Sequence, residues 1–170
     1  DILLIDKEAD VCTETSSANT AIIHAGYDAH HGTLNAEMSV EGNRLWATVA
    51  QELNVAFKRC GTYVVAIGPD ELSKLDPLLE NGRKNGVPAL DIISGEEMRL
   101  REPSLNPDAS GALWAPTGGV IDVFGATVAA AENAVEPLDA GGDPLGVFGR
   151  GRHAFSRGSA SRAEIGVKSV

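Results

Sequence analysis

Apolar and polar residues follow strand-like and helix-like patterns over the first 136 residues of the chain. Four consecutive apolar residues at 2–5 predict a short strand that is covered on both faces. From Thr33, a suitable N-cap, apolar residues recur at helical spacing through Asn54 and predict one long amphipathic helix. Short apolar segments bounded by turn residues predict further strands at 21–23, 57–68, 92–93 and 110–115.

Three more helices are predicted over 69–86, 95–101 and 124–135. Pro69 suits the first turn of the first of these, and Asp76 with Pro77 is expected to break or kink it. Ser94, with Glu97 three residues later, predicts a capping box for the second. The third is rich in alanine, the residue with the highest helix propensity.

A carboxylate and a hydroxyl-rich turn follow the first apolar run. Asp6 ends the run, Lys7 comes next, and the turn then carries Thr15, Ser16, Ser17 and Asn19. In a Rossmann-type fold, an acidic residue in this place accepts hydrogen bonds from a ribose. The glycine fingerprint that should stand about 20 residues earlier would precede Asp1, so we expect either a fragment or a different kind of protein.

The composition narrows the class of protein. A formal net charge of −10 argues against sequence-independent binding to nucleic acid or to anionic membranes, because both need a basic face. No run approaches the roughly 20 apolar residues of a spanning helix and the start lacks the form of a signal peptide, so we expect a cytoplasmic protein. Cys12 and Cys60 have no CxxC spacing and are predicted to be free thiols. No metal or phosphate-loop motif is present, so we expect no bound metal.

The last segment, 137–170, differs in kind from the rest of the chain. It holds 5 basic and 3 acidic residues, against 9 and 21 in residues 1–136. Because it is dense in Gly, Ser and Arg and lacks a regular period, we predict a poorly ordered tail. A frameshifted, chimeric or mispredicted end is the preferred explanation, and a basic tail that binds nucleic acid is the alternative.

Five motifs, in register over about 130 residues, carry a resemblance to a known family. They are LLIDKEADVCTETSSANTAIIHAGYDA, GTLNAEMSVEGNRLW, FKRCGTYVVAIG, NGVPALDIISGEEMRLREPSLNPDASGALWAPTGGVID and ATVAAAENAVE. This part of the chain resembles FAD-dependent oxidoreductases of the D-amino-acid oxidase superfamily, after their first strand and helix. It is most similar to the branch of glycerol-3-phosphate dehydrogenase-like and L-2-hydroxyglutarate dehydrogenase-like proteins.

The resemblance implies an α/β fold, with an α+β substrate domain attached to a partial Rossmann-like FAD-binding unit. Four parts follow along the chain: a partial FAD-binding domain at 1–54, a substrate-domain segment at 55–121, a returning helix at 122–136 and the atypical tail at 137–170. The segments 57–68 and 110–121 correspond to parts of the family's large sheet. We expect Trp46, Phe57, Tyr63 and Trp114 to pack in the core.

The resemblance also implies a cofactor site. Asp6 would accept from the FAD ribose, and Lys7, Thr15, Ser16, Ser17 and Asn19 would lie along the cofactor near its pyrophosphate. His24 would run beside the isoalloxazine ring and is the candidate catalytic residue. Each has a plainer interpretation, because Asp6 can belong to a solvated turn and His24 can be structural. Lys58 and Arg59 are expected to face water.

The implied reaction is oxidation of a C–H bond beside a hydroxyl or amine, with hydride transfer to the flavin. The implied substrate is a small anionic 2-hydroxy acid or glycerol 3-phosphate, while the electron acceptor and the oligomeric state stay unassigned. We expect the chain to be a fragment that is inactive, or nearly so, by itself. The alternative is a non-enzymatic α/β binding or interaction module derived from the same fold.

Overall fold

The computed structural model describes residues 7–135, 153–155 and 163–165, and the chain divides into two compact units. The central unit consists of Ala21–Glu52 and Ala56–Ile121. The terminal unit consists of Asp1–Thr20, Leu53–Val55 and Asp122–Val170. Asp6 and the predicted strand at 2–5 lie outside the described residues.

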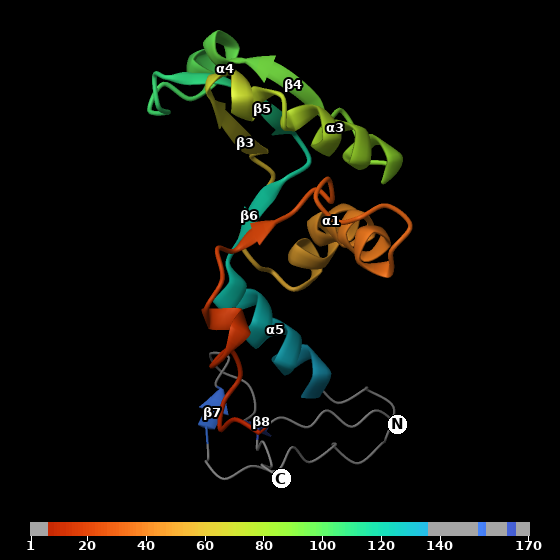
Figure 1. Cartoon of the computed structure of the whole chain (residues 1–170). Helices are drawn as coiled ribbons and strands as arrows, with labels where there is room; N and C mark the ends of the chain where they lie inside the picture. The colour runs from red at the N-terminus through yellow and green to blue at the C-terminus, as the bar shows by residue number, and fades with distance from the viewer. Residues whose placement is uncertain (1–6, 136–152, 156–162, 166–170) are drawn as a thin grey trace. The chain divides into compact units, whose positions relative to one another are not determined.

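An antiparallel three-stranded sheet forms the body of the central unit (Figure 1). Its strands, in spatial order, are β3 (Thr62–Ile67), β5 (Ala109–Ala115) and β4 (Asp91–Ser94). In the middle strand, Ala112 lies opposite Val65 on one side and Ile93 on the other. Extended segments were predicted in all three places, and β3 pairs with β5 in one sheet.

The two faces of this sheet carry two hydrophobic clusters, because neighbouring strand residues point to opposite faces. Leu113 belongs to a cluster with Leu75 and Leu90, whereas Ala112 belongs to a second cluster with Ile93 and Met98. Leu113 and Met98 are the largest fully buried side chains. Truncating such a residue to alanine costs about 2–5 kcal/mol, so these clusters dominate the stability of the unit.

Tyr63 and Trp114 extend the second cluster, with ring centroids 4.5 Å apart. Both are only partly buried, as are Trp46 and Phe57. Tyr63 and Trp114 therefore border the core, and none of the four aromatic residues is fully buried.

Three short helices flank the sheet: α2 (Gly68–Leu72), α3 (Leu75–Lys84) and α4 (Gly95–Arg101). The predicted capping of α4 is confirmed, since Ser94 Oγ accepts from the Glu97 backbone N–H at 3.1 Å. The predicted break of the helix over 69–86 is confirmed, because α2 ends at Leu72 and α3 begins at Leu75. The break falls just ahead of Asp76, so Pro77 sits in the first turn of α3, where its missing N–H has no helical partner to lose.

A smaller antiparallel sheet joins β1 (Ile22–Ile23), β6 (Gly119–Ile121) and β2 (Phe57–Lys58) in that order. Strand β6 was not among the strands predicted from the pattern of apolar residues. Helix α1 (Leu34–Glu52) belongs to the same unit and contacts β2. Its predicted N-cap is confirmed, because Thr33 Oγ1 accepts from the Ala36 backbone N–H at 3.3 Å.

In the terminal unit, the 3-10 turn η1 (Thr15–Ser17) contacts helix α5 (Val123–Val135). Two short strands, β7 (His153–Phe155) and β8 (Ala163–Ile165), pair antiparallel within the tail. The rest of the tail lies outside the described residues, so its predicted poor order stays a prediction. No helix within the described ranges is both long and apolar enough to cross a membrane.

Candidate functional site

The loop between β1 and α1, residues 24–31, contains the predicted catalytic histidine and is called the HAG loop here. Ala25, Gly26 and Tyr27 are buried in a row, while His24 and Asp28 on either side of them are exposed. Gly26 has a φ of +100°, and a Cβ at this position would lie 2.6 Å from Val40 Cγ2. Only glycine fits there, so the loop lies directly against α1.

Asn43 of α1 holds the start of the HAG loop. Its buried side-chain Nδ2 donates to the carbonyl oxygens of His24 and Thr117, at 2.9 Å each. Its Oδ1 accepts from Arg59 Nη1 at 3.0 Å, and Arg59 Nη2 donates to the Asn43 carbonyl at 2.9 Å. Arg59 is exposed, as expected, and its guanidinium also closes a polar network around Asn43.

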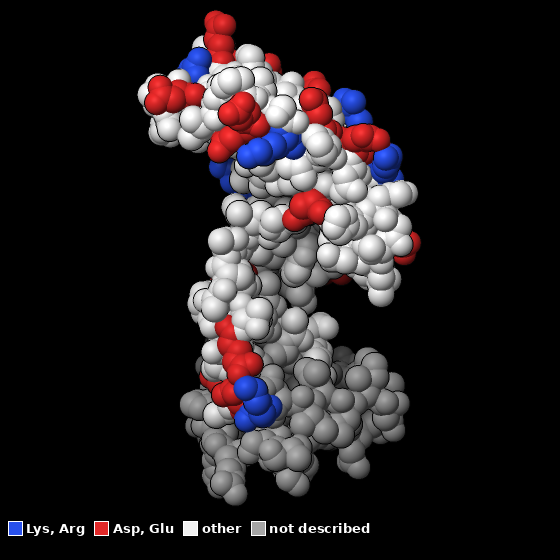
Figure 2. All heavy atoms as spheres, viewed as in Figure 1, with Lys and Arg blue, Asp and Glu red and all other residues white. Residues whose placement is uncertain are grey.

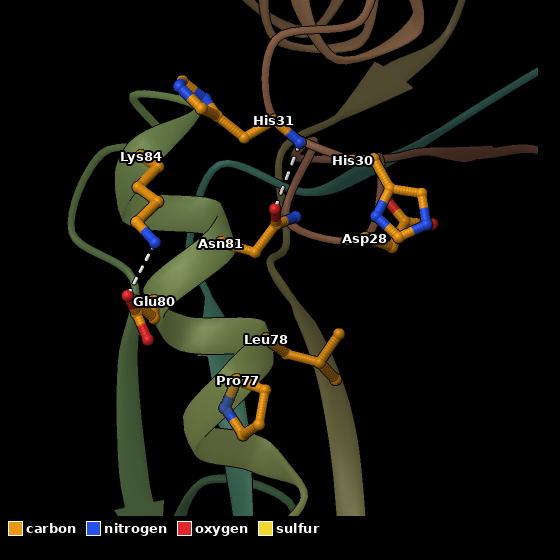
Figure 3. Close-up of a pocket in the computed structure, with 8 residues that line it drawn as sticks. All are labelled: Asp28, His30, His31, Pro77, Leu78, Glu80, Asn81 and Lys84. Carbon is orange, nitrogen blue, oxygen red and sulfur yellow. Dashed lines mark hydrogen bonds and ion pairs between the residues drawn. The ribbon is translucent and has the colours of Figure 1, made fainter.

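Helix α3 holds the rest of the loop through two asparagines one turn apart. Asn81 Nδ2 donates to the carbonyls of Tyr27 and Ala29, at 2.8 Å each. Asn85 Nδ2 donates to the carbonyls of Gly26 (2.9 Å) and Ala29 (2.7 Å). Figure 3 shows the Asn81 side chain reaching from α3 toward His31, whose backbone N–H donates to Asn81 Oδ1 at 3.2 Å.

His24 combines a fixed backbone with an accessible imidazole. Its side chain is 53% exposed, and its Nδ1 lies 3.9 Å from Asp28 Oδ2 in the same loop. Beside them, burial raises the pKa of the Tyr27 hydroxyl, and the Asp28 carboxylate adds to the rise. The arrangement leaves one titratable ring free to meet a ligand while its anchor is held.

The predicted cofactor residues lie in the terminal unit, around η1. Ser17 Oγ donates to the Glu14 carbonyl at 2.7 Å, and Asn19 Nδ2 donates to the carbonyls of Thr15 (3.0 Å) and Ser16 (2.9 Å). Within the part of the chain that the structure describes, the hydroxyls of Thr15 and Ser16 make no hydrogen bond.

Lys7 is paired with two carboxylates. Its Nζ lies 3.2 Å from Glu8 Oε1 and also bonds to Glu14 Oε1. The bond from Glu14 is the main reason that the pKa of Lys7 is raised. The five described residues are therefore gathered in one unit, whereas His24 belongs to the other.

A hollow of about 540 Å³ lies between the HAG loop and α3 (Figure 3). None of the predicted site residues lines it. Its walls are Asp28, His30, His31, Pro77, Leu78, Glu80, Asn81 and Lys84, and Lys84 is paired with Glu80 at 2.6 Å. Among the described residues, no three His, Cys, Asp or Glu side chains are grouped to hold a metal ion.

Sequence reasoning missed the three asparagines. Asn is disfavoured inside helices, because its side chain competes for backbone hydrogen bonds. Asn81 and Asn85 are four residues apart, which places them on one helix face. That spacing was the available signal, although it does not show which backbone groups the side chains reach.

Comparisons with known proteins place this architecture. A glycerol 3-phosphate dehydrogenase of Caloramator mitchellensis is 47% identical over 135 residues, which are 79% of this chain and 28% of the relative. The mitochondrial L-2-hydroxyglutarate dehydrogenase of Homo sapiens is 28% identical over 165 residues, which are 97% of this chain and 35% of the relative. The chain thus spans about a third of the length of these relatives.

A solved structure agrees with the sequence matches. The L-alpha-glycerophosphate oxidase of Mycoplasma pneumoniae, with FAD bound, superposes with a TM-score of 0.71 at 28% identity, over 76% of this chain and 35% of that one. The family model described as FAD dependent oxidoreductase matches residues 1–137. The chain therefore belongs to the FAD-dependent oxidoreductase family.

Proposed function

We propose that this chain serves an FAD-dependent dehydrogenase that oxidises a small anionic 2-hydroxy acid or glycerol 3-phosphate. The observation that carries the proposal is the 47% identity with a glycerol 3-phosphate dehydrogenase over 135 residues. The match to an L-2-hydroxyglutarate dehydrogenase supports the wider substrate class. Both named substrates carry an anionic group near the carbon that bears the hydroxyl.

The turn around η1 fits a dinucleotide cofactor. Thr15 is exposed and Ser16 is half-buried, and both offer short hydroxyls that are not engaged elsewhere among the described residues. Such groups bind phosphate oxygens without crowding them. We assign Lys7, Thr15, Ser16, Ser17 and Asn19 to the cofactor and Asp6 to its ribose.

His24 is the residue that we assign to the reaction. FAD, when bound, supplies the hydride acceptor. Imidazole exchanges protons near neutral pH, and this imidazole is accessible on a backbone held by Asn43. His24 is suited to accept the hydroxyl proton of the substrate or to orient that hydroxyl.

We also propose a cytoplasmic location, which is supported by the free thiols of Cys12 and Cys60. These two were predicted to be free. In the view of Figure 2, basic and acidic side chains are interspersed over the central unit.

A segment exchange tests the function. Residues 1–135 of this chain replace the matching segment of the Caloramator mitchellensis glycerol 3-phosphate dehydrogenase. We expect the purified chimaera to keep the flavin absorbance band and to oxidise glycerol 3-phosphate or L-2-hydroxyglutarate with an artificial electron acceptor. The matched control is the unexchanged dehydrogenase.

Each failure of the exchange has a separate meaning. A folded chimaera that loses FAD contradicts the cofactor assignment and favours the binding-module alternative. One that keeps FAD but oxidises neither compound contradicts the substrate class. If the large exchange does not fold by circular dichroism, the exchange of residues 7–31 alone asks the same questions.

In parallel, FAD titrated into the 170-residue chain is expected to give little flavin quenching, and tight stoichiometric quenching would overturn the expected inactivity of the chain.

A further inference from the structure

We propose that Asn43, Asn81 and Asn85 act together as a carboxamide clamp that positions the HAG loop, and with it His24, for the reaction. The catalytic part of this inference rests on the proposed function. The clamp itself rests on the hydrogen bonds of the central unit alone. Each of the three is a positioning residue, because each acts on the loop backbone.

The clamp meets a need of the loop backbone. Four carbonyl oxygens of the loop, those of His24, Gly26, Tyr27 and Ala29, accept from the three asparagine side chains. The residues between them pack inward, since Ala25 is 1% exposed and Tyr27 and Ala29 are 8% exposed. Buried carbonyls without partners are costly, and this segment has no strand or helix partner to supply them.

The three side chains use one bonding pattern. In each, the amide nitrogen donates to two carbonyl oxygens, and Oδ1 accepts one N–H. The donors to Oδ1 are Arg59 Nη1, the His31 backbone N–H and the His31 ring. Both N–H donors of each carboxamide are used and its oxygen accepts one hydrogen, so the orientation of each side chain is fixed.

This orientation assigns the proton on His31. Asn85 Oδ1 lies 3.1 Å from His31 Nδ1, and the amide nitrogen of Asn85 is committed to the carbonyls of Gly26 and Ala29. Because an amide oxygen only accepts, His31 Nδ1 carries a hydrogen. The far end of the HAG loop is therefore latched to the same asparagine that holds its middle.

The clamp is mounted on rigid elements from two sides. Asn43 projects from α1, and Asn81 and Asn85 project from α3, which is anchored by buried Leu75. Residues in a well-packed helix move little, so the groups that they bind are also held in place. His24 thus keeps a backbone position set by the core, although its side chain is exposed.

The first test uses the 170-residue chain, without cofactor. Asn81→Ala and Asn85→Ala are expected to speed hydrogen exchange and broaden the NMR signals of residues 24–31, while β3 and β5 keep their protection. Asn35→Ala, at an exposed position of α1, is the matched control and should leave the loop unchanged. Unchanged exchange and line widths in both clamp variants would overturn the clamp.

The second test uses the active chimaera. Asn85→Ala is expected to lower kcat by up to about 100-fold with FAD content and KM little changed, because a misplacement of about 1 Å has effects of this size. Asn85→Asp keeps the shape but loses both donors, so it should not restore kcat. Restoration by Asp, or a kcat equal to that of Asn35→Ala, would contradict the positioning role. An inactive wild-type chimaera would count against the proposed function. The hydrogen-exchange test of the clamp in the 170-residue chain would still be valid.

Discussion

Two polar segments, one in each compact unit, are held in opposite ways. Around η1, the side chains of Ser17 and Asn19 bond to carbonyl oxygens three or four residues away along the chain. In the HAG loop, the asparagine bonds span 19 residues from Asn43, 54 or 52 from Asn81 and 59 or 56 from Asn85. The bonds described around η1 are local, whereas the HAG loop is held by side chains from distant parts of the central unit.

This contrast teaches where each segment is vulnerable. A turn with local bonds keeps its structure when a distant residue is substituted, because its donors and acceptors lie in the same short segment. A loop held by remote side chains loses its order when any anchor is removed or displaced. The following substitutions test that difference, beginning with the largest expected effect.

Asn43→Ala removes the buried anchor and leaves the carbonyls of His24 and Thr117 and the Arg59 guanidinium without this partner. We expect a loss of about 3 kcal/mol in the free energy of unfolding, since unpaired buried polar groups carry such costs. Urea denaturation measures it. Asn35→Ala serves as the control, and equal midpoints for the two variants would refute the remote-anchor interpretation.

Gly26→Ala pushes a methyl group into Val40 and forces a residue with a Cβ to a φ of +100°. We expect a loss of about 2 kcal/mol from strain and contact together. Val40→Ala in the same chain should recover the contact part and leave the strain. A double-mutant cycle measured by thermal unfolding separates the two, and complete recovery would show that the backbone is not strained.

Tyr27→Phe tests the buried part of the HAG loop through the pH dependence of stability. Burial raises the pKa of the folded-state Tyr27 hydroxyl above its ordinary value of 10.0, so its stabilising effect is present below that pH and is lost as the pH rises through the folded-state pKa. We expect wild type to lose stability more steeply than Tyr27→Phe above pH 10. Urea denaturation of both proteins over an alkaline series measures this, and parallel curves would contradict it.

Asn19→Ala should have the smallest effect. It removes two local bonds in an exposed turn, for which changes of about 0.5 kcal/mol or less are usual. The same substitution is expected to weaken flavin retention in the chimaera, because Asn19 is assigned to the cofactor. A large loss of stability without loss of flavin would invert the comparison.

The sequence predicted the elements whose signals are local. The N-cap at Thr33 and the capping of α4 by Ser94 are confirmed, since each depends on residues three positions apart. Strand β6 escaped prediction because its short segment becomes a strand only when β1 and β2 pair with it from distant parts of the chain. The family resemblance supplied the oxidoreductase assignment, which periodicity alone did not provide.

The site shows the same division. Arg59 was expected to face water and is exposed, but its guanidinium also donates to Asn43 and Thr117, residues 16 and 58 positions away, which its place at a strand edge did not indicate. The roles of Asn81 and Asn85 depend on partners more than 50 positions away. No spacing within one helix can identify those partners, because they are set by how the helix docks.

Gly82 lies between the two α3 asparagines, and a Cβ there would stand 2.8 Å from Tyr27 Cβ and 2.4 Å from Leu90 Cδ2. At Gly82 the helix and the loop therefore pack so closely that only a hydrogen atom fits in place of a side chain. A single added methyl would wedge the two apart and stretch the bonds of Asn81 and Asn85 at once. The lack of a side chain at Gly82 thus lets α3 lie close enough for Asn81 and Asn85 to hydrogen-bond to the loop.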